Sequence, residues 1–141
     1  MLTEEIVALS FPSRIASIAE ATARVVEIAA ARGFDEDAIF AIDMAVREAV
    51  TNAVIHGNRE DESRIFDVSI ANTPEGLTIG VRDRGAGFDP EAVPDPTDAA
   101  NLMGTSGRGI LFMRNFMDAV EWTSHAEGGT IVRMTKRRAT P

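Results

Sequence analysis

Apolar residues recur along this chain with the two spacings that distinguish strands from helices. Alternation of apolar and polar residues predicts the five strands 5–11, 66–71, 77–82, 120–124 and 130–135. Apolar residues three and four positions apart predict the three helices 13–32, 38–57 and 110–118. With short turns between consecutive strands, this order favours a mixed, mainly antiparallel sheet with helices on one face. We therefore expect an α+β, two-layer sandwich.

Side chains at the helix ends support these boundaries. Ser13 can cap the first helix, and either Asp35 or Asp37 can cap the second. Gly33 and Gly57 stand where the two helices should end. In the first helix we expect the core stripe Ile15, Ile18, Thr22, Val25, Val26 and Ala29.

The second helix carries polar residues on both flanks of its apolar side. The expected apolar side is Ile39, Ile42, Val46, Ala49, Val50 and Ala53. One flank holds Asp43, Arg47 and Thr51, and it reads as a solvated surface. The other holds Glu48, Asn52 and His56, about one helical turn apart, beside small alanines that leave space. Glu48 and Asn52 are either a hydrogen-bonded structural pair or two groups that act on one ligand.

The composition narrows the range of functions. A chain of 141 residues is expected to form a single domain, 1–141, with one core. It has no cysteine, and neither a membrane span nor a signal peptide is recognisable, so we expect a cytoplasmic protein. A net charge of −8 argues against binding nucleic acid or an anionic membrane. Lys136 is the only lysine, which excludes a P-loop.

Two further segments are candidates for ligand binding. The long segment from Asp89 to Thr105 has little periodicity, as expected of a lid or binding segment, or of simple disorder. The glycines from Gly104 to Gly109 precede the third helix, where backbone N–H groups can approach an anion. Glycine-rich turns are common, so this second pattern is weak by itself.

Three segments in a fixed order carry a resemblance. They are EAVTNAVIHG from Glu48 to Gly57, DRGAGF from Asp83 to Phe88, and GTSGRGI from Gly104 to Ile110. Together they resemble the N, G1 and G2 boxes of the GHKL ATPase superfamily, which shares the Bergerat fold. The short length and the segment from Met113 to Asp118 favour its anti-sigma-factor serine kinases, of the RsbW and SpoIIAB type.

The resemblance implies a role for each matching residue. Asn52 would bind Mg²⁺ through a neutral oxygen, and Glu48 would be the catalytic base. Asp83 would accept a hydrogen bond from the adenine amino group of ATP or ADP, with Gly85 and Gly87 beside the base. The remaining nucleotide contacts would come from Thr105, Ser106, Gly107, Arg108 and Gly109. An arginine of the first helix, Arg14 or Arg24, would assist transfer, and the sequence does not choose between them.

The implied function is an ATP-dependent protein-serine kinase that acts as an anti-sigma factor. Its expected partners are an antagonist protein of the STAS type, which it phosphorylates, and a sigma factor, which it sequesters. A homodimer is also implied. The alternative is a non-catalytic module that binds ATP only to hold a partner protein.

Overall fold

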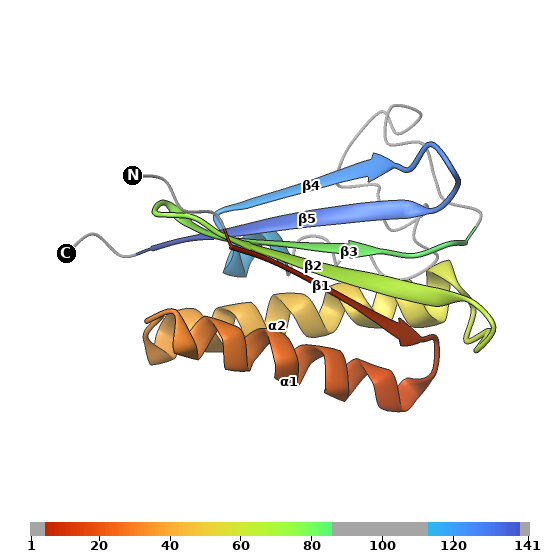
Figure 1. Cartoon of the computed structure of the whole chain (residues 1–141), viewed down its shortest axis with the longest axis horizontal. Helices are drawn as coiled ribbons and strands as arrows, with labels where there is room; N and C mark the ends of the chain where they lie inside the picture. The colour runs from red at the N-terminus through yellow and green to blue at the C-terminus, as the bar shows by residue number, and fades with distance from the viewer. Residues whose placement is uncertain (1–4, 86–112, 139–141) are drawn as a thin grey trace.

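Five antiparallel strands form one sheet in the computed structural model, which describes residues 5–85 and 113–138. The strands are β1 (Glu5–Pro12), β2 (Ile65–Asn72), β3 (Gly76–Arg82), β4 (Ala119–Ser124) and β5 (Thr130–Arg137). They lie in the order β1-β2-β3-β5-β4, so β5 is inserted between β3 and β4 (Figure 1). This confirms the expected fold class and all five predicted strands. The expected lid and the third helix up to residue 112 lie outside the described residues.

Alternation along the strands gives the sheet one apolar face. Cross-strand neighbours such as Val7 and Ile70, or Ile79 and Met134, stand side by side on that face. Ile70, Ile79 and Met134 are almost completely buried, because this face is covered by the helices. The opposite face is made mostly of the small and polar residues that alternate with them, and it also carries Ile6, Ile65 and Ile131.

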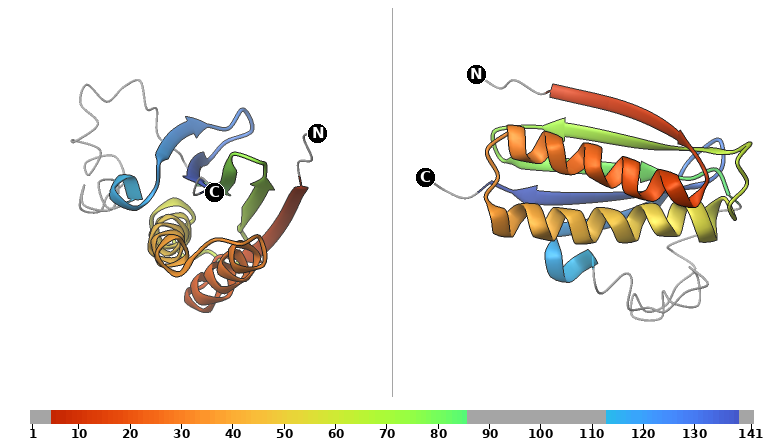
Figure 2. Two further views of the ribbon diagram at one scale, coloured as in Figure 1. Left: turned by 90° about the vertical axis from the view of Figure 1, so that its left-hand side faces the viewer. Right: turned by 90° about the horizontal axis from the view of Figure 1, so that it is seen from below.

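Two long helices, α1 (Ile15–Ala31) and α2 (Glu36–Thr51), lie side by side across the apolar face (Figure 2). The predicted apolar side of α2 is confirmed, with Ile42, Val46 and Val50 fully buried. Its solvated flank is confirmed as well, since Arg47 pairs with Asp43 at 3.1 Å.

The boundaries of α1 differ from those predicted. The helix begins after Arg14, and no side chain caps it. Ser13 is buried, and its hydroxyl donates to the carbonyl oxygen of Arg64 instead, so the predicted cap was wrong. In the core stripe, Thr22, Val25 and Ala29 are buried as predicted. Ile15 is wrong, because it is 54% exposed while Ser17 is buried instead. Gly33 ends the helix with φ +87°, as predicted.

The second helix differs in how it ends. Asp35, rather than Asp37, caps its start by accepting from the backbone N–H of Ala38 at 2.8 Å. A single π-helical turn, η1 (Asn52–Gly57), replaces the last part of the predicted α-helix. In this turn the N–H of Asn58 donates to the carbonyl oxygen of Ala53, five residues back, at 2.8 Å. Such π turns are rare and occur frequently at functional sites.

Burial on the sheet predicts a large difference between two isoleucines. Ile79→Ala, at a fully buried position of the central strand, should lower the free energy of unfolding by about 2–5 kcal/mol. Ile6→Ala, at a position 67% exposed on the edge strand, should change it by about 0.5 kcal/mol or less. Urea denaturation of both variants measures the two values. Equal losses would contradict the placement of the core.

Candidate nucleotide-binding site

The candidate site forms where the end of β3 meets the start of β5. Asp83, the first residue after β3, is 9% exposed. Its Oδ1 accepts hydrogen bonds from the backbone N–H groups of Gly85 at 2.9 Å and Thr130 at 3.3 Å. The N–H of Asp83 donates to the carbonyl oxygen of Thr130 at 3.0 Å. The carboxylate is therefore held by one backbone group from the turn after β3 and one from the start of β5.

Burial changes the ionisation of Asp83. Loss of hydration raises the pKa of this carboxyl group above its ordinary value. The two backbone N–H groups and the charge of Arg82 oppose the rise without cancelling it. The site thus holds a carboxylate at a cost to stability, which is a common property of functional residues.

Glycines surround this carboxylate because nothing larger fits. A Cβ atom on Gly57 would lie 2.5 Å from Cγ of Asp83, and one on Gly85 would lie 1.9 Å from the carbonyl oxygen of Gly57. Gly129 has φ +92°, and its Cβ would lie 1.9 Å from the carbonyl oxygen of Asp83. The turn after β3 is thus packed directly against the π turn and the start of β5.

Asn52 lies at the junction of α2 and η1, where it lines a small cavity together with Asp83. It is 4% exposed, and its Oδ1 has no hydrogen-bond partner among the described residues. The cavity has a volume of about 20 Å³, enough for roughly one water molecule. Its lining consists of Ala49, Asn52, Ala53, Val81, Asp83, Met113, Trp122, Thr130 and Val132. The structure therefore brings together Asn52 and Asp83, which are far apart in sequence.

Two residues of this site were missed by the sequence analysis. Thr130 reaches it because β5 pairs with β3, and Trp122 because β4 pairs with β5. The Nε1 atom of Trp122 is buried and has no partner among the described residues. The guanidinium group of Arg114 lies 5.2 Å from the centre of the Trp122 ring, a cation–π contact. The available sequence signal was that Trp122 is the sole tryptophan and alternates with exposed neighbours.

The other predicted site residues are distributed as follows. Glu48 is half-buried on α2, one turn before Asn52, and does not line the cavity. Gly85 lies in the turn after Asp83. The remaining candidates lie outside the described residues: Gly87, Thr105, Ser106, Gly107, Arg108 and Gly109.

The described residues contain no cluster of three or more histidine, aspartate or glutamate side chains that could hold a metal ion. Within the same two segments, no helix is long and apolar enough to cross a membrane. His125 accepts a hydrogen bond through Nδ1 from the N–H of Glu127 at 3.0 Å, which is a turn contact.

Comparisons with known proteins identify the family of this chain. The histidine kinase-like ATPase domain family matches residues 11–136. An anti-sigma F factor of Heyndrickxia coagulans is 37% identical over 134 residues, which cover 93% of this chain and 91% of that protein. One from Clostridium botulinum (strain Alaska E43 / Type E3) is 34% identical over 122 residues, which cover 84% and 85%.

A solved structure with the same fold contains the RsbU and RsbW domains of Rv1364c from Mycobacterium tuberculosis. The likeness covers 97% of this chain and 33% of that one, with a TM-score of 0.65 and 20% identity. The chain belongs to the histidine kinase-like ATPase domain family, a family of ATP-binding domains. Within that family it stands with the anti-sigma F factors, as the resemblance predicted.

The raised pKa of Asp83 predicts how stability depends on pH. A carboxyl group with a higher pKa in the folded state favours folding below its unfolded pKa, and this contribution is lost as pH rises through the folded pKa. Asp83→Asn removes the titration. The stability of this variant relative to the parent should therefore increase from pH 3 to pH 7, as measured by urea denaturation at each pH.

Asp61→Asn provides a control of opposite sign. Hydrogen bonds from the side chain and backbone N–H of Ser63 lower the pKa of this exposed carboxyl group, so its contribution is lost as pH falls. The relative stability of Asp61→Asn should decrease over the same pH range. A flat or falling curve for Asp83→Asn would contradict the effect of burial at that residue.

The position of Trp122 predicts an optical signal. As the only tryptophan, and with its ring in the cavity lining, it should change its emission when ATP binds. A fluorescence titration with ATP measures the change, and Trp122→Phe supplies the blank. If isothermal calorimetry shows binding while the emission stays constant, Trp122 does not line the nucleotide pocket.

Proposed function

We propose that this protein is an ATP-dependent protein-serine kinase that acts as an anti-sigma factor. It transfers the γ-phosphate of ATP to a serine of a STAS-type antagonist protein and sequesters a sigma factor. The similarity to proteins named anti-sigma F factor supports a sigma factor as a partner. The proposal also includes a cytoplasmic location and a homodimer. Light scattering tests the homodimer.

The observation that carries the proposal is the oxygen of Asn52, which has no hydrogen-bond partner in the part of the chain that the structure describes. A buried amide oxygen without a partner costs about 1–3 kcal/mol, so its retention beside Asp83 supports a role in binding a ligand. Mg²⁺ prefers oxygen ligands and commonly takes one or two from the protein and others from phosphates. Asn52 fits that arrangement. When bound, Mg²⁺ would neutralise charge on the phosphates.

The other residues have separate tasks in this proposal. Asp83 accepts the hydrogen bond of the adenine amino group and excludes guanine, whose oxygen at that position cannot donate. Glu48, one helical turn from Asn52, accepts the proton of the attacking serine hydroxyl. The serine oxygen forms the new bond to the γ-phosphorus, and the bond from that phosphorus to the bridging oxygen breaks to release ADP.

Two substitutions in α2 and η1 test this assignment through their contrast. Glu48→Gln keeps size and hydrogen bonding but removes the base. Affinity for ATP should stay within a few-fold, while phosphotransfer to the antagonist falls by about 10²–10⁴. Asn52→Ala removes the protein oxygen proposed for Mg²⁺, so affinity and transfer should fall together. Calorimetry measures the affinity, and labelled ATP with a candidate STAS-type antagonist measures the transfer.

The same experiment separates the kinase from a module that only binds ATP. A non-catalytic module should hold its sigma factor equally well after Glu48→Gln and should transfer no phosphate in the parent. Transfer at the parental rate in Glu48→Gln would remove Glu48 as the base.

A further inference from the structure

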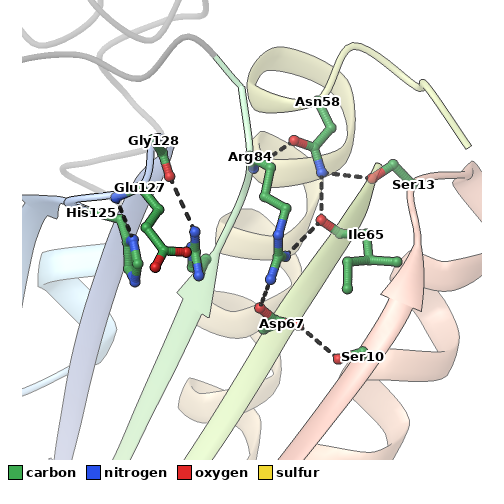
Figure 3. Close-up of polar contacts among 10 residues, drawn as sticks. Ser10, Ser13, Asn58, Ile65, Asp67, Arg84, His125, Glu127 and Gly128 are labelled. Carbon is green, nitrogen blue, oxygen red and sulfur yellow. Dashed lines mark hydrogen bonds and ion pairs between the residues drawn. The ribbon is translucent and has the colours of Figure 1, made fainter. Parts of the chain in front are cut away.

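We infer that Asn58 is a positioning residue for the adenine-binding carboxylate of Asp83. This inference rests on the proposed function of Asp83 and adds a residue that lies outside the cavity lining. Asn58 follows η1 directly and is completely buried. Its side chain joins the end of β3 to the starts of α1 and β2 (Figure 3).

Three hydrogen bonds satisfy the Asn58 side chain. Its Oδ1 accepts from the backbone N–H of Arg84 at 2.7 Å. Its Nδ2 donates to Oγ of Ser13 at 2.7 Å and to the carbonyl oxygen of Ile65 at 3.1 Å. Ser13 in turn donates to the carbonyl oxygen of Arg64 at 2.6 Å. An amide with both N–H groups and its oxygen engaged inside the protein is held in one orientation.

The bond to Arg84 is the one that reaches the site. Arg84 lies between Asp83 and Gly85, whose N–H binds the Asp83 carboxylate. Gly57 packs so closely against the same carboxylate that it has no room for a Cβ. The consecutive residues Gly57 and Asn58 therefore lie against the consecutive residues Asp83 and Arg84. The direction of the carboxylate thus depends on where Asn58 holds the backbone of Arg84.

The Arg84 side chain strengthens this connection at the surface. It pairs with Asp67 at 2.6 Å and donates to the carbonyl oxygen of Ile65 at 3.1 Å. Asp67 also accepts a hydrogen bond from the hydroxyl of Ser10 at 2.7 Å. Both charged side chains of the pair are about one third exposed, so solvent screens it. The buried amide of Asn58, rather than this ion pair, is therefore the part that positions Asp83.

The proposal is tested by the ratio of ATP to GTP affinity, which does not depend on how much protein is folded. Asn58→Ala removes the acceptor for the Arg84 N–H, so we expect this ratio to fall by about tenfold, as for one lost hydrogen bond in a buried site. Asn58→Asp keeps an oxygen toward Arg84 and should retain the parental ratio. Calorimetry with each nucleotide gives the ratio.

Two controls separate positioning from stability. Ser13→Ala removes a partner of Nδ2 and should lower the melting temperature without changing the ratio. Arg84→Ala keeps the backbone N–H and should also retain the ratio. If Asn58→Ala loses stability like Ser13→Ala but keeps the parental ratio, or if Asn58→Asp loses the ratio as fully as Asn58→Ala, the inference is overturned.

A nucleotide-free measurement distinguishes this inference from the proposed function. In Asn58→Ala the N–H groups of Gly85 and Thr130 should exchange with solvent at least about tenfold faster than in Ser13→Ala, because the carboxylate that accepts them is no longer held. Equal exchange in the two variants overturns the positioning role. A parent that shows no preference for ATP, with the exchange difference present, would instead contradict the adenine role of Asp83.

Discussion

The turn after β3 can pack against the end of η1 only because neither backbone carries a side chain at the contact. The Cβ of an alanine at Gly85 would lie 1.9 Å from the carbonyl oxygen of Gly57, far inside van der Waals distance. This close approach brings the N–H of Arg84 within 2.7 Å of Asn58. It also places Asp83 and Asn52 on the walls of one cavity, although 31 positions separate them in sequence (83 minus 52).

Polar groups around this contact fall into two kinds. Those that hold the backbone have hydrogen-bond partners; the side chain of Asn58 and Oδ1 of Asp83 are of this kind. Those that face the cavity, Asn52 Oδ1 and Trp122 Nε1, are buried without partners among the described residues. A protein selected only for stability would replace or pair such groups, since each costs about 1–3 kcal/mol. The ligand proposed above would supply a partner to both of these groups.

Sequence patterns could predict the strands because alternation is a local property that burial on one face imposes. They failed at Ser13 and Ile15, because the hydroxyl of Ser13 bonds to Arg64, 51 positions away, and many alanines in α1 leave its phase ambiguous. Asn52 was singled out by its helical spacing from Glu48, and Asp83 through motifs that resemble a known family. Thr130 and Trp122 were not, because their place depends on β5 lying between β3 and β4.

The π turn changes which residue follows Asn52 on the same side of the helix. In a continuous α-helix, the residue that follows Asn52 on the same side one turn later would be His56, four positions along the chain. In the π turn the backbone hydrogen bonds span five residues, so this place is taken by Gly57, the residue that packs against Asp83. A histidine at position 57 would clash, because its Cβ would lie 2.5 Å from Cγ of Asp83. The extra residue of the π turn thus allows the helix to carry Asn52 into the cavity and still leave the adjacent space to Asp83.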